Sequence, residues 1–318
     1  MIKVVFPDQA IFEEYIPYLD ALKPLERNAE IIAYSEAPCE KEERYERLKD
    51  ADVIIFGVHK FDNEFLKRLE KLKMLQFMGV GYATFADPEF CEKSGILFMG
   101  VDNYGSNAVA EYALAQMLSL ARNVVAADRY MRDGKWVYTN LEGIEISDST
   151  VGILGAGNIG CLVAKKLRAL GARVIVNDVF ESEELKNEVG VEYAPIEEVF
   201  SKSDIISVHV KYLPATKNLV SEKLIKLMKK EALFINTSRS EIVDMEALTD
   251  ALRSGSIKGA AIDVFDDEPL TDFSICRLPN VQTSPHIGYF SGKAKGNCLK
   301  KCVDQVVEKL PLLNIPFH

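Results

Sequence analysis

The sequence is poor in the residues that build metal sites, disulfide frameworks and nucleic-acid surfaces. Its 318 residues include four histidines, one tryptophan and six cysteines. No two cysteines form a CxxC pair, and no cysteine–histidine cluster has zinc spacing, so we expect reduced thiols and no metal. Positive charge is also scarce, with 38 lysines and arginines against 48 acidic residues. This acidity argues against a nucleic-acid partner.

Long hydrophobic runs are missing as well. No apolar stretch approaches the roughly 20 residues that cross a membrane. The start, MIKVVFP, lacks the apolar core of a secretory signal peptide. These absences predict a cytoplasmic protein with no membrane partner. The length suits two domains, and the apolar content is ample for their cores.

Short apolar runs alternate with amphipathic, charged stretches along the whole chain. Continuous apolar strands with helices between them are typical of parallel sheets covered on both faces, which predicts an α/β fold with two doubly wound sheets. The expected strands of the first series are 2–7, 29–35, 51–58, 75–80 and 96–101. Those of the second series are 151–155, 172–178, 204–210, 232–237, 259–265 and 281–286.

A long helical stretch, residues 107–131, separates the two series. Its first half is apolar on nearly all sides, which predicts burial between domains or against a second copy of the chain. A final amphipathic helix is expected at 292–310.

A glycine loop opens the second series. The segment VGILGAGNIG places Gly155, Gly157 and Gly160 in a G-x-G-x-x-G pattern between a strand and a helix. The first glycine permits a tight turn, the second lets the backbone approach a pyrophosphate, and the third lets helix and strand pack closely. The helix N-terminus then offers unpaired N–H groups to phosphates. The alternative is an ordinary strand–helix turn.

Asp178 ends the next strand, eighteen residues after Gly160. At this position of a dinucleotide-binding unit an acidic residue accepts hydrogen bonds from the ribose hydroxyls. Its charge would repel a 2′-phosphate, so the sequence favours NAD over NADP. The alternative is a turn residue at a strand end.

Three polar residues follow successive strands of the second series. Arg239, Glu268 and His286 are expected at the carboxyl ends, where ligands bind in doubly wound sheets. An arginine can clamp a carboxylate, a histidine can exchange a proton near neutral pH, and a glutamate can fix the imidazole tautomer. Beside a nicotinamide this set suits reduction of a 2-oxo acid. Taken singly, each has a plain structural alternative: surface ion pair, loop acid or turn histidine.

The chain resembles the NAD-dependent D-isomer-specific 2-hydroxyacid dehydrogenases over nearly its whole length. The likeness is densest from VGILGAGNIG through LMKKEALFINTSRSEIVDMEALTDALRSGSIKGAAIDVFDDEPL to SPHIGYF. It implies a Rossmann-type NAD domain at 104–287, inserted in a flavodoxin-like substrate domain at 1–103 and 288–318. It also implies a homodimer built on the helix that starts at Asn107.

The resemblance implies roles for individual residues. Arg239 would bind the substrate carboxylate, and His286, paired with Glu268, would act as general acid. Substrate contacts would come from Val80, Gly81, Tyr104 and Tyr289. Cofactor contacts would come from Gly155, Gly157, Asn158, Ile159, Gly160, Asp178, Val210, Lys211, Thr216, Thr237, Ser238 and Asp263.

Three positions depart from the family pattern: residues 211, 213 and 240. Lysine and leucine replace the usual proline and threonine at 211 and 213. Ser240 stands where glycine is usual and would be strained if the backbone needs a positive φ. Lys211 brings a positive charge to the loop over the adenosine ribose. Cys161, at a helix N-terminus, raises a further hypothesis of a reactive thiol.

The substrate is expected to be a small or apolar 2-oxo acid such as pyruvate or 2-oxoisocaproate. GVGY at 79–82 also resembles glyoxylate and hydroxypyruvate reductases. The alternatives are therefore such a reductase, a non-catalytic NAD-sensing protein on the same fold, or, less well matched, a formate-type enzyme.

Overall fold

The computed structural model describes residues 1–7, 15–34 and 40–313. The chain divides into two compact units, one of residues 1–105 and 290–318 and one of residues 106–289. These boundaries fall two residues after the expected 103 and 287. Of the residues discussed above, Cys39 lies outside the described part. The other five cysteines are free thiols.

Unit 1, residues 1–105 and 290–318, contains a five-stranded parallel sheet in the order β2-β1-β3-β4-β5. All five strands coincide with expected runs, and this order is that of flavodoxin-like sheets. The strands are β1 (Ile2–Phe6), β2 (Ala29–Ala33), β3 (Val53–Phe56), β4 (Met74–Phe77) and β5 (Leu97–Met99). The α-helices are α2 (Lys23–Glu26), α3 (Lys41–Leu48), α4 (Asn63–Lys67), α5 (Pro88–Lys93) and α12 (Gly292–Lys309).

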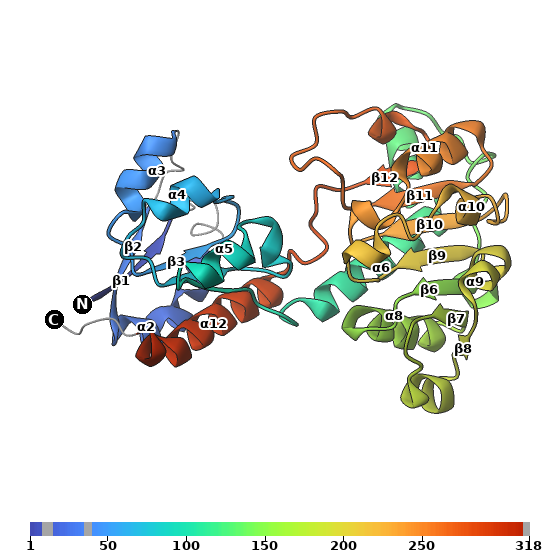
Figure 1. The fold of residues 1–318 in the computed structure, drawn as a ribbon. Helices are drawn as coiled ribbons and strands as arrows, with labels where there is room; N and C mark the ends of the chain where they lie inside the picture. The colour runs from blue at the N-terminus through green and yellow to red at the C-terminus, as the bar shows by residue number, and fades with distance from the viewer. Residues whose placement is uncertain (8–14, 35–39, 314–318) are drawn as a thin grey trace. The chain divides into compact units, whose positions relative to one another are not determined.

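Alternate residues of each strand in unit 1 enter opposite cores, because successive side chains of a strand point to opposite faces. Val53 and Ile55 pack with buried residues of α12, whereas Ile54 and Phe56 pack with those of α3, α4 and α5. Helices therefore cover both faces of the sheet (Figure 1). The last helix, α12, belongs to this unit although it is the most distant in sequence.

Unit 2, residues 106–289, contains a seven-stranded parallel sheet in the order β12-β11-β10-β9-β6-β7-β8. The strands are β6 (Thr150–Leu154), β7 (Arg173–Asn177), β8 (Glu192–Tyr193), β9 (Ile205–Val208), β10 (Leu233–Asn236), β11 (Gly259–Ile262) and β12 (Val281–Thr283). Strand β8 is not among the expected strands, because it has only two residues and no apolar run. The order reverses beside β6, and ligands bind at such switch points.

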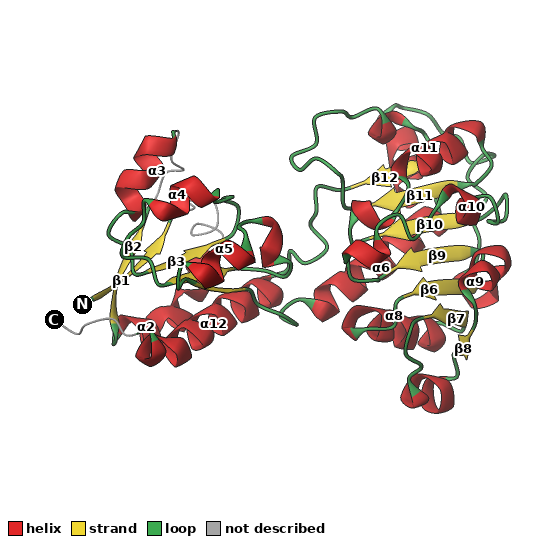
Figure 2. Ribbon diagram, in the orientation of Figure 1, coloured by secondary structure: helices red, strands yellow, loops and turns green. Residues whose placement is uncertain are grey.

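The helices of unit 2 cover both faces of its sheet (Figure 2). They are α6 (Ser106–Ala121), α7 (Val124–Arg132), α8 (Asn158–Ala169), α9 (Ile196–Lys202), α10 (Glu222–Ile225) and α11 (Met245–Ser254). The two parallel sheets with their helices confirm the predicted fold class.

The single helix expected at 107–131 is wrong, because α6 and α7 are separate helices. Asn123 lies between them in the left-handed conformation, with φ of 54°. Its side-chain amide donates hydrogen bonds to the carbonyls of Leu141 and Glu142. Asparagine tolerates this conformation better than most residues, and the two bonds hold the break in place. Burial of α6 is also confined to one stripe of small residues and a methionine: Ala110, Ala113, Met117 and Ala121.

Candidate active site

The glycine loop connects β6 to α8 and leaves no room for side chains at two of its glycines. Gly155 has φ of +88°, and a Cβ there would lie 2.7 Å from the backbone nitrogen of Val210. A Cβ on Gly160 would lie 1.9 Å from the carbonyl oxygen of Gly155. Both glycines are therefore required by packing within unit 2, as the motif predicts.

The middle of the loop, in contrast, has free space, which suits a bound dinucleotide. Gly157 is the residue before the first turn of α8, and a Cβ there would meet nothing within 4 Å. Asn158 and Ile159 begin the helix, whose N-terminus favours anions. The Oγ1 atom of Thr237, at the carboxyl end of β10, is buried without a hydrogen-bond partner among the described residues. An open approach and an unpaired hydroxyl fit the predicted cofactor site.

Asp178 is the first residue after β7, the neighbour of β6. Its carboxylate accepts hydrogen bonds from the N–H groups of Ala156, at 2.5 Å, and Phe180, at 3.1 Å. These two hydrogen bonds hold the side chain of Asp178 beside the glycine loop. The next two residues, Val179 and Phe180, are 89 % and 81 % exposed. Neither side chain carries a positive charge.

The loop after β9 flanks the glycine loop on its other side and is closed by its own hydrogen bonds. The hydroxyl of Thr216 donates to the carbonyl of Lys211 and accepts from the N–H of Leu213. The hydroxyl of Ser238 donates to the carbonyl of Val210 at 2.6 Å. The hydroxyls of Thr216 and Ser238 therefore bond to the loop itself. The backbone groups of the loop and the side chain of Lys211 remain to contact a ligand.

His209 begins this loop and anchors it to the sheet. Its N–H donates to the carbonyl of Leu154 at 2.7 Å, and its Nε2 atom lies 2.9 Å from the hydroxyl of Ser207. Desolvation lowers the pKa of His209 from 6.5 to about 4. The ring is therefore neutral at physiological pH, which suits a structural role.

The catalytic candidates follow three adjacent parallel strands. Arg239 follows β10, Glu268 follows β11 and His286 follows β12. The Nδ1 atom of His286 lies 2.6 Å from an Oε of Glu268, and the other Oε accepts from the N–H of Phe265 at 3.0 Å. Arg239 is near enough to act on the same carboxyl.

The surroundings of Glu268 keep it ionised. Burial raises the pKa of its carboxyl. The hydrogen bond and charge of His286, the N–H of Phe265 and the charge of Arg239 lower the pKa by more in total, so the pKa lies below its ordinary value. An ionised carboxylate that accepts from Nδ1 leaves Nε2 of His286 as the atom available for proton exchange. The pair can therefore present a proton to a carbonyl oxygen.

The comparisons with known proteins agree with this geometry. A profile of the D-isomer specific 2-hydroxyacid dehydrogenase, NAD binding domain, matches residues 114–288, more than half of the chain. The chain belongs to the D-isomer specific 2-hydroxyacid dehydrogenase family. It is an NAD-dependent oxidoreductase of D-2-hydroxy acids, as predicted.

Individual relatives cover most of the chain but carry different names. The sequence is 32 % identical to a glyoxylate reductase of Korarchaeum cryptofilum over 90 % of this chain and 88 % of that protein. It is 34 % identical to a D-3-phosphoglycerate dehydrogenase of Methanocaldococcus jannaschii over 87 % of this chain and 52 % of that protein. A D-lactate dehydrogenase of Sporolactobacillus superposes with a TM-score of 0.80, at 30 % identity, over 100 % of this chain and 98 % of that one.

In this dehydrogenase the histidine predicted to be catalytic has an unusual backbone. His286 adopts φ of +54°, in the left-handed region. Such a conformation costs about 1–3 kcal/mol for a non-glycine residue and persists only where its surroundings enforce it. Its N–H donates to the carbonyl of Asp263 at 2.8 Å. Nothing in the sequence SPH predicts a positive φ at His286. The family pattern predicts possible strain at Ser240 instead.

Two concerns raised by the sequence do not arise in the structure. Ser240 is not among the described residues with positive φ, and it lies buried at the start of a short helical turn, so serine fits there without strain. The reactive-thiol hypothesis for Cys161 is not supported, because burial raises the pKa of its thiol despite the helix N-terminus.

The predicted substrate contacts are divided between the units. Val80 and Gly81 follow β4 in unit 1, where both are exposed and Gly81 has φ of 82°. Tyr104 packs against the α12 side of the unit 1 core. Tyr289 lies in unit 2, where its ring centroid is 6.2 Å from that of His286. Of these four residues, the structure therefore places Tyr289 beside His286 within one unit.

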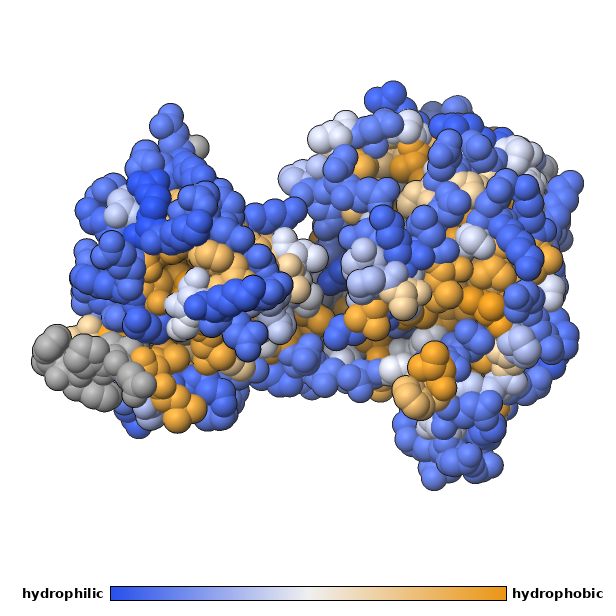
Figure 3. Space-filling view, in the orientation of Figure 1, coloured by the Kyte–Doolittle hydropathy of each residue, from blue (hydrophilic) through white to orange (hydrophobic). Residues whose placement is uncertain are grey.

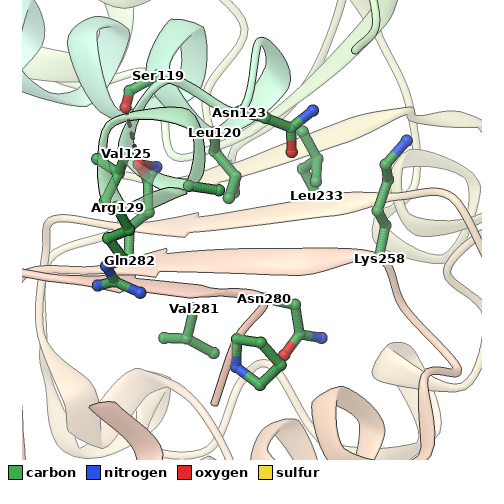
Figure 4. Close-up of a pocket in the computed structure, with 12 residues that line it drawn as sticks. Ser119, Leu120, Asn123, Val125, Arg129, Leu233, Lys258, Asn280, Val281 and Gln282 are labelled. Atoms are coloured by element: carbon green, nitrogen blue, oxygen red, sulfur yellow. Dashed lines mark hydrogen bonds between the residues drawn. The ribbon is translucent and has the colours of Figure 1, made fainter. Parts of the chain in front are cut away.

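A cavity of about 70 Å³ lies elsewhere in unit 2, at the amino ends of β10, β11 and β12. Figure 4 shows Arg129 and Lys258 at opposite edges of it, with Ser119 bonded to Gln282. Because His286, Glu268 and Arg239 follow the carboxyl ends of the same strands, this cavity is not the active site.

No helix among the described residues is long and apolar enough to cross a membrane. Within the same residues, no group of three or more potential metal ligands comes together.

Proposed function

We propose that the protein reduces a small 2-oxo acid to the D-2-hydroxy acid, and catalyses the reverse reaction, with His286 as general acid and base. The observation that carries the proposal is the 2.6 Å bond between His286 and Glu268, at strand ends adjacent to that of Arg239. Hydride transfer needs a proton at the new hydroxyl, and this pair is placed to provide it.

The chain's own residues would divide the work as follows. Arg239 binds the substrate carboxylate and so fixes the orientation of the carbonyl. The Nε2 atom of His286 donates the proton, while Glu268 holds the ring and stabilises its charged form. The glycine loop, Asp178, Thr237 and the loop after β9 would hold NAD. When bound, that cofactor supplies or accepts the hydride.

Val80 and Gly81 of unit 1 would contribute to substrate binding through their backbone N–H groups, which suit a carboxylate oxygen. Both residues are exposed on the loop after β4, and Gly81 needs its left-handed backbone. We assign substrate binding to unit 1 and NAD binding to unit 2 on this basis.

The substrate we favour carries a small or apolar side chain, as pyruvate and 2-oxoisocaproate do. The aromatic ring of Tyr289 beside His286 supports this choice. Glyoxylate is the second candidate, because named relatives such as the Korarchaeum cryptofilum protein are glyoxylate reductases. Glyoxylate has hydrogen in place of a side chain, so it gains nothing from an apolar wall.

The test is NADH oxidation with glyoxylate, hydroxypyruvate, pyruvate, 2-oxoisocaproate and phenylpyruvate, using the wild type and His286→Ala. We expect turnover of at least one acid, and a loss of 10²-fold or more in His286→Ala. Equal rates in both proteins would refute the catalytic role. Tight NADH binding without turnover of any acid would favour the NAD-sensing alternative.

Tyr289→Ala separates the two substrate classes. Removal of the ring should raise KM for 2-oxoisocaproate by about tenfold, which corresponds to the loss of a small apolar contact. Glyoxylate is the matched control and should change by less than about twofold. Equal effects on both acids would contradict a contact between Tyr289 and the substrate side chain.

We also propose a homodimer. Large hydrophobic side chains are exposed on α6, α7 and the segment after them: Leu118, Val124, Met131, Trp136 and Tyr138. Figure 3 shows that other hydrophobic residues also reach the surface of unit 2, on the side where Figure 1 labels α9 and α10. Exposed apolar clusters of this kind mark protein contacts. Light scattering should give twice the chain mass, and a monomer at micromolar concentration would refute the proposal.

A further inference from the structure

Asp263 carries a buried carboxylate that is saturated by one short turn of the chain. The residue is 1 % exposed. One carboxylate oxygen accepts from the hydroxyl of Ser284 at 2.5 Å and from the N–H of Ile287 at 3.0 Å. The other oxygen accepts from the N–H of Gly288 at 2.8 Å. These donors bracket His286 on both sides.

Ser284 extends the connection to α6. Its hydroxyl accepts from the Nε2 atom of Gln116 at 3.3 Å, and the same atom of Gln116 lies 2.9 Å from the hydroxyl of Tyr112. A chain of side-chain contacts therefore runs from α6 through Ser284 to Asp263, all within unit 2. These residues are far apart in sequence.

The turn has a reason to need such support. His286 is held at φ of +54°, a conformation that relaxes unless the surrounding bonds enforce it. Gly288 is packed so closely that an added Cβ would lie 3.0 Å from the carboxylate of Asp263. A small rotation of this turn would lengthen the 2.6 Å bond to Glu268, on which proton transfer depends.

We propose that Ser284 and Gln116 are positioning residues, which act through the Asp263 carboxylate to hold His286 in its left-handed turn. The inference rests on the proposed role of His286 as general acid. A carboxylate occupied by three donors of the turn supports the histidine directly, in addition to any contact that Asp263 makes with NAD. Neither Ser284 nor Gln116 touches the reacting atoms.

The test is Ser284→Ala in the full-length enzyme, with kcat, KM and the Kd for NADH measured on the best substrate of the panel. We expect kcat to fall about five- to tenfold, the effect of one lost hydrogen bond, while the Kd for NADH stays within twofold. Ser284→Thr keeps the hydroxyl and should restore kcat to within about twofold of the wild type.

Ser119→Ala is the matched control. It removes another side-chain hydrogen bond between α6 and β12, from Ser119 to Gln282 at 2.7 Å, and Gln282 lies two residues before Ser284 in the sequence. We expect its kcat to stay within about twofold of the wild type. An equal loss in Ser119→Ala would show that docking of α6 in general is responsible, which would overturn the proposal.

Five further outcomes are decisive. An unchanged kcat in Ser284→Ala, or a Kd for NADH that weakens in step with kcat, would overturn the positioning role. If Ser284→Ala does not fold, Gln116→Met tests the hydrogen bond from α6 to Ser284. We expect kcat to fall two- to fivefold in Gln116→Met, and an unchanged kcat would overturn the proposal. His286→Ala separates the two hypotheses: full activity there refutes the proposed function, whereas an inactive His286→Ala with a fully active Ser284→Ala refutes the positioning role alone.

Discussion

Lowering the pH should destabilise unit 2 through His209, which anchors the loop beside the glycine motif. Desolvation lowers the pKa of this ring from 6.5 to about 4. Between these values the unfolded chain binds a proton that the folded chain does not, so stability is complete above about pH 6.5 and is lost as the pH falls towards 4. The limiting loss is about 3 kcal/mol, and about 2 kcal/mol is reached at pH 5. Because His209 as a residue is only partly buried by its exposed area, we halve this value to about 1 kcal/mol.

The assay is urea unfolding at pH 7 and pH 5, followed by circular dichroism, with hydrogen exchange of β9 to assign the transition to unit 2. His209→Gln keeps a neutral polar side chain, so its stability should fall about 1 kcal/mol less than that of the wild type between the two pH values. Ser207→Ala, which removes only the partner of the ring, should keep the pH dependence. If the wild type and His209→Gln lose equal stability, the histidine does not carry a desolvated neutral ring and the reasoning is refuted.

Four other variants test the site directly. Glu268→Gln removes the charge that supports His286 and should lower kcat about 10- to 100-fold, by steady-state assay, with NADH affinity retained; an unchanged kcat would count against the pair. Asp178→Ser removes the carboxylate beside the glycine loop and should shift the NADH-to-NADPH preference by about tenfold towards NADPH; a fixed ratio of kcat/KM values would contradict the ribose role. Gly160→Ala should unfold unit 2, because its Cβ would lie 1.9 Å from a carbonyl oxygen, whereas Gly157→Ala should fold normally and bind NADH more weakly. Thermal melts and fluorescence titration distinguish these last two, and equal stability would show that the close packing is not required.

Local patterns were sufficient for most of the architecture. Apolar runs and turn residues predicted the five strands of unit 1 and six of the seven in unit 2, because buried parallel strands need continuous apolar sequence. The two-residue strand β8 has no such run and was missed. The break between α6 and α7 was missed because its cause, hydrogen bonds from Asn123 to the carbonyls of Leu141 and Glu142, is a tertiary contact.

The candidate site shows the same division. Glycine spacing predicted the dinucleotide loop, and strand-end placement brought Arg239, Glu268 and His286 to one edge of the sheet. The resemblance to a family added their separate roles. The family pattern predicts possible strain at Ser240, whereas the structure has a positive φ at His286. The value of φ depends on how the Ser284–Gly288 turn is held and not on residue type alone.

By itself, the sequence determined which segments are strands, where the cofactor loop lies and which polar residues follow the strands, because these depend on neighbours along the chain. Tertiary structure alone decided that Asp263 and Ser284 hold the turn of His286, that burial raises the pKa of the Cys161 thiol at its helix N-terminus, and that His209 stays neutral. Each of these depends on hydrogen bonds or desolvation by residues distant in sequence, which no local pattern records.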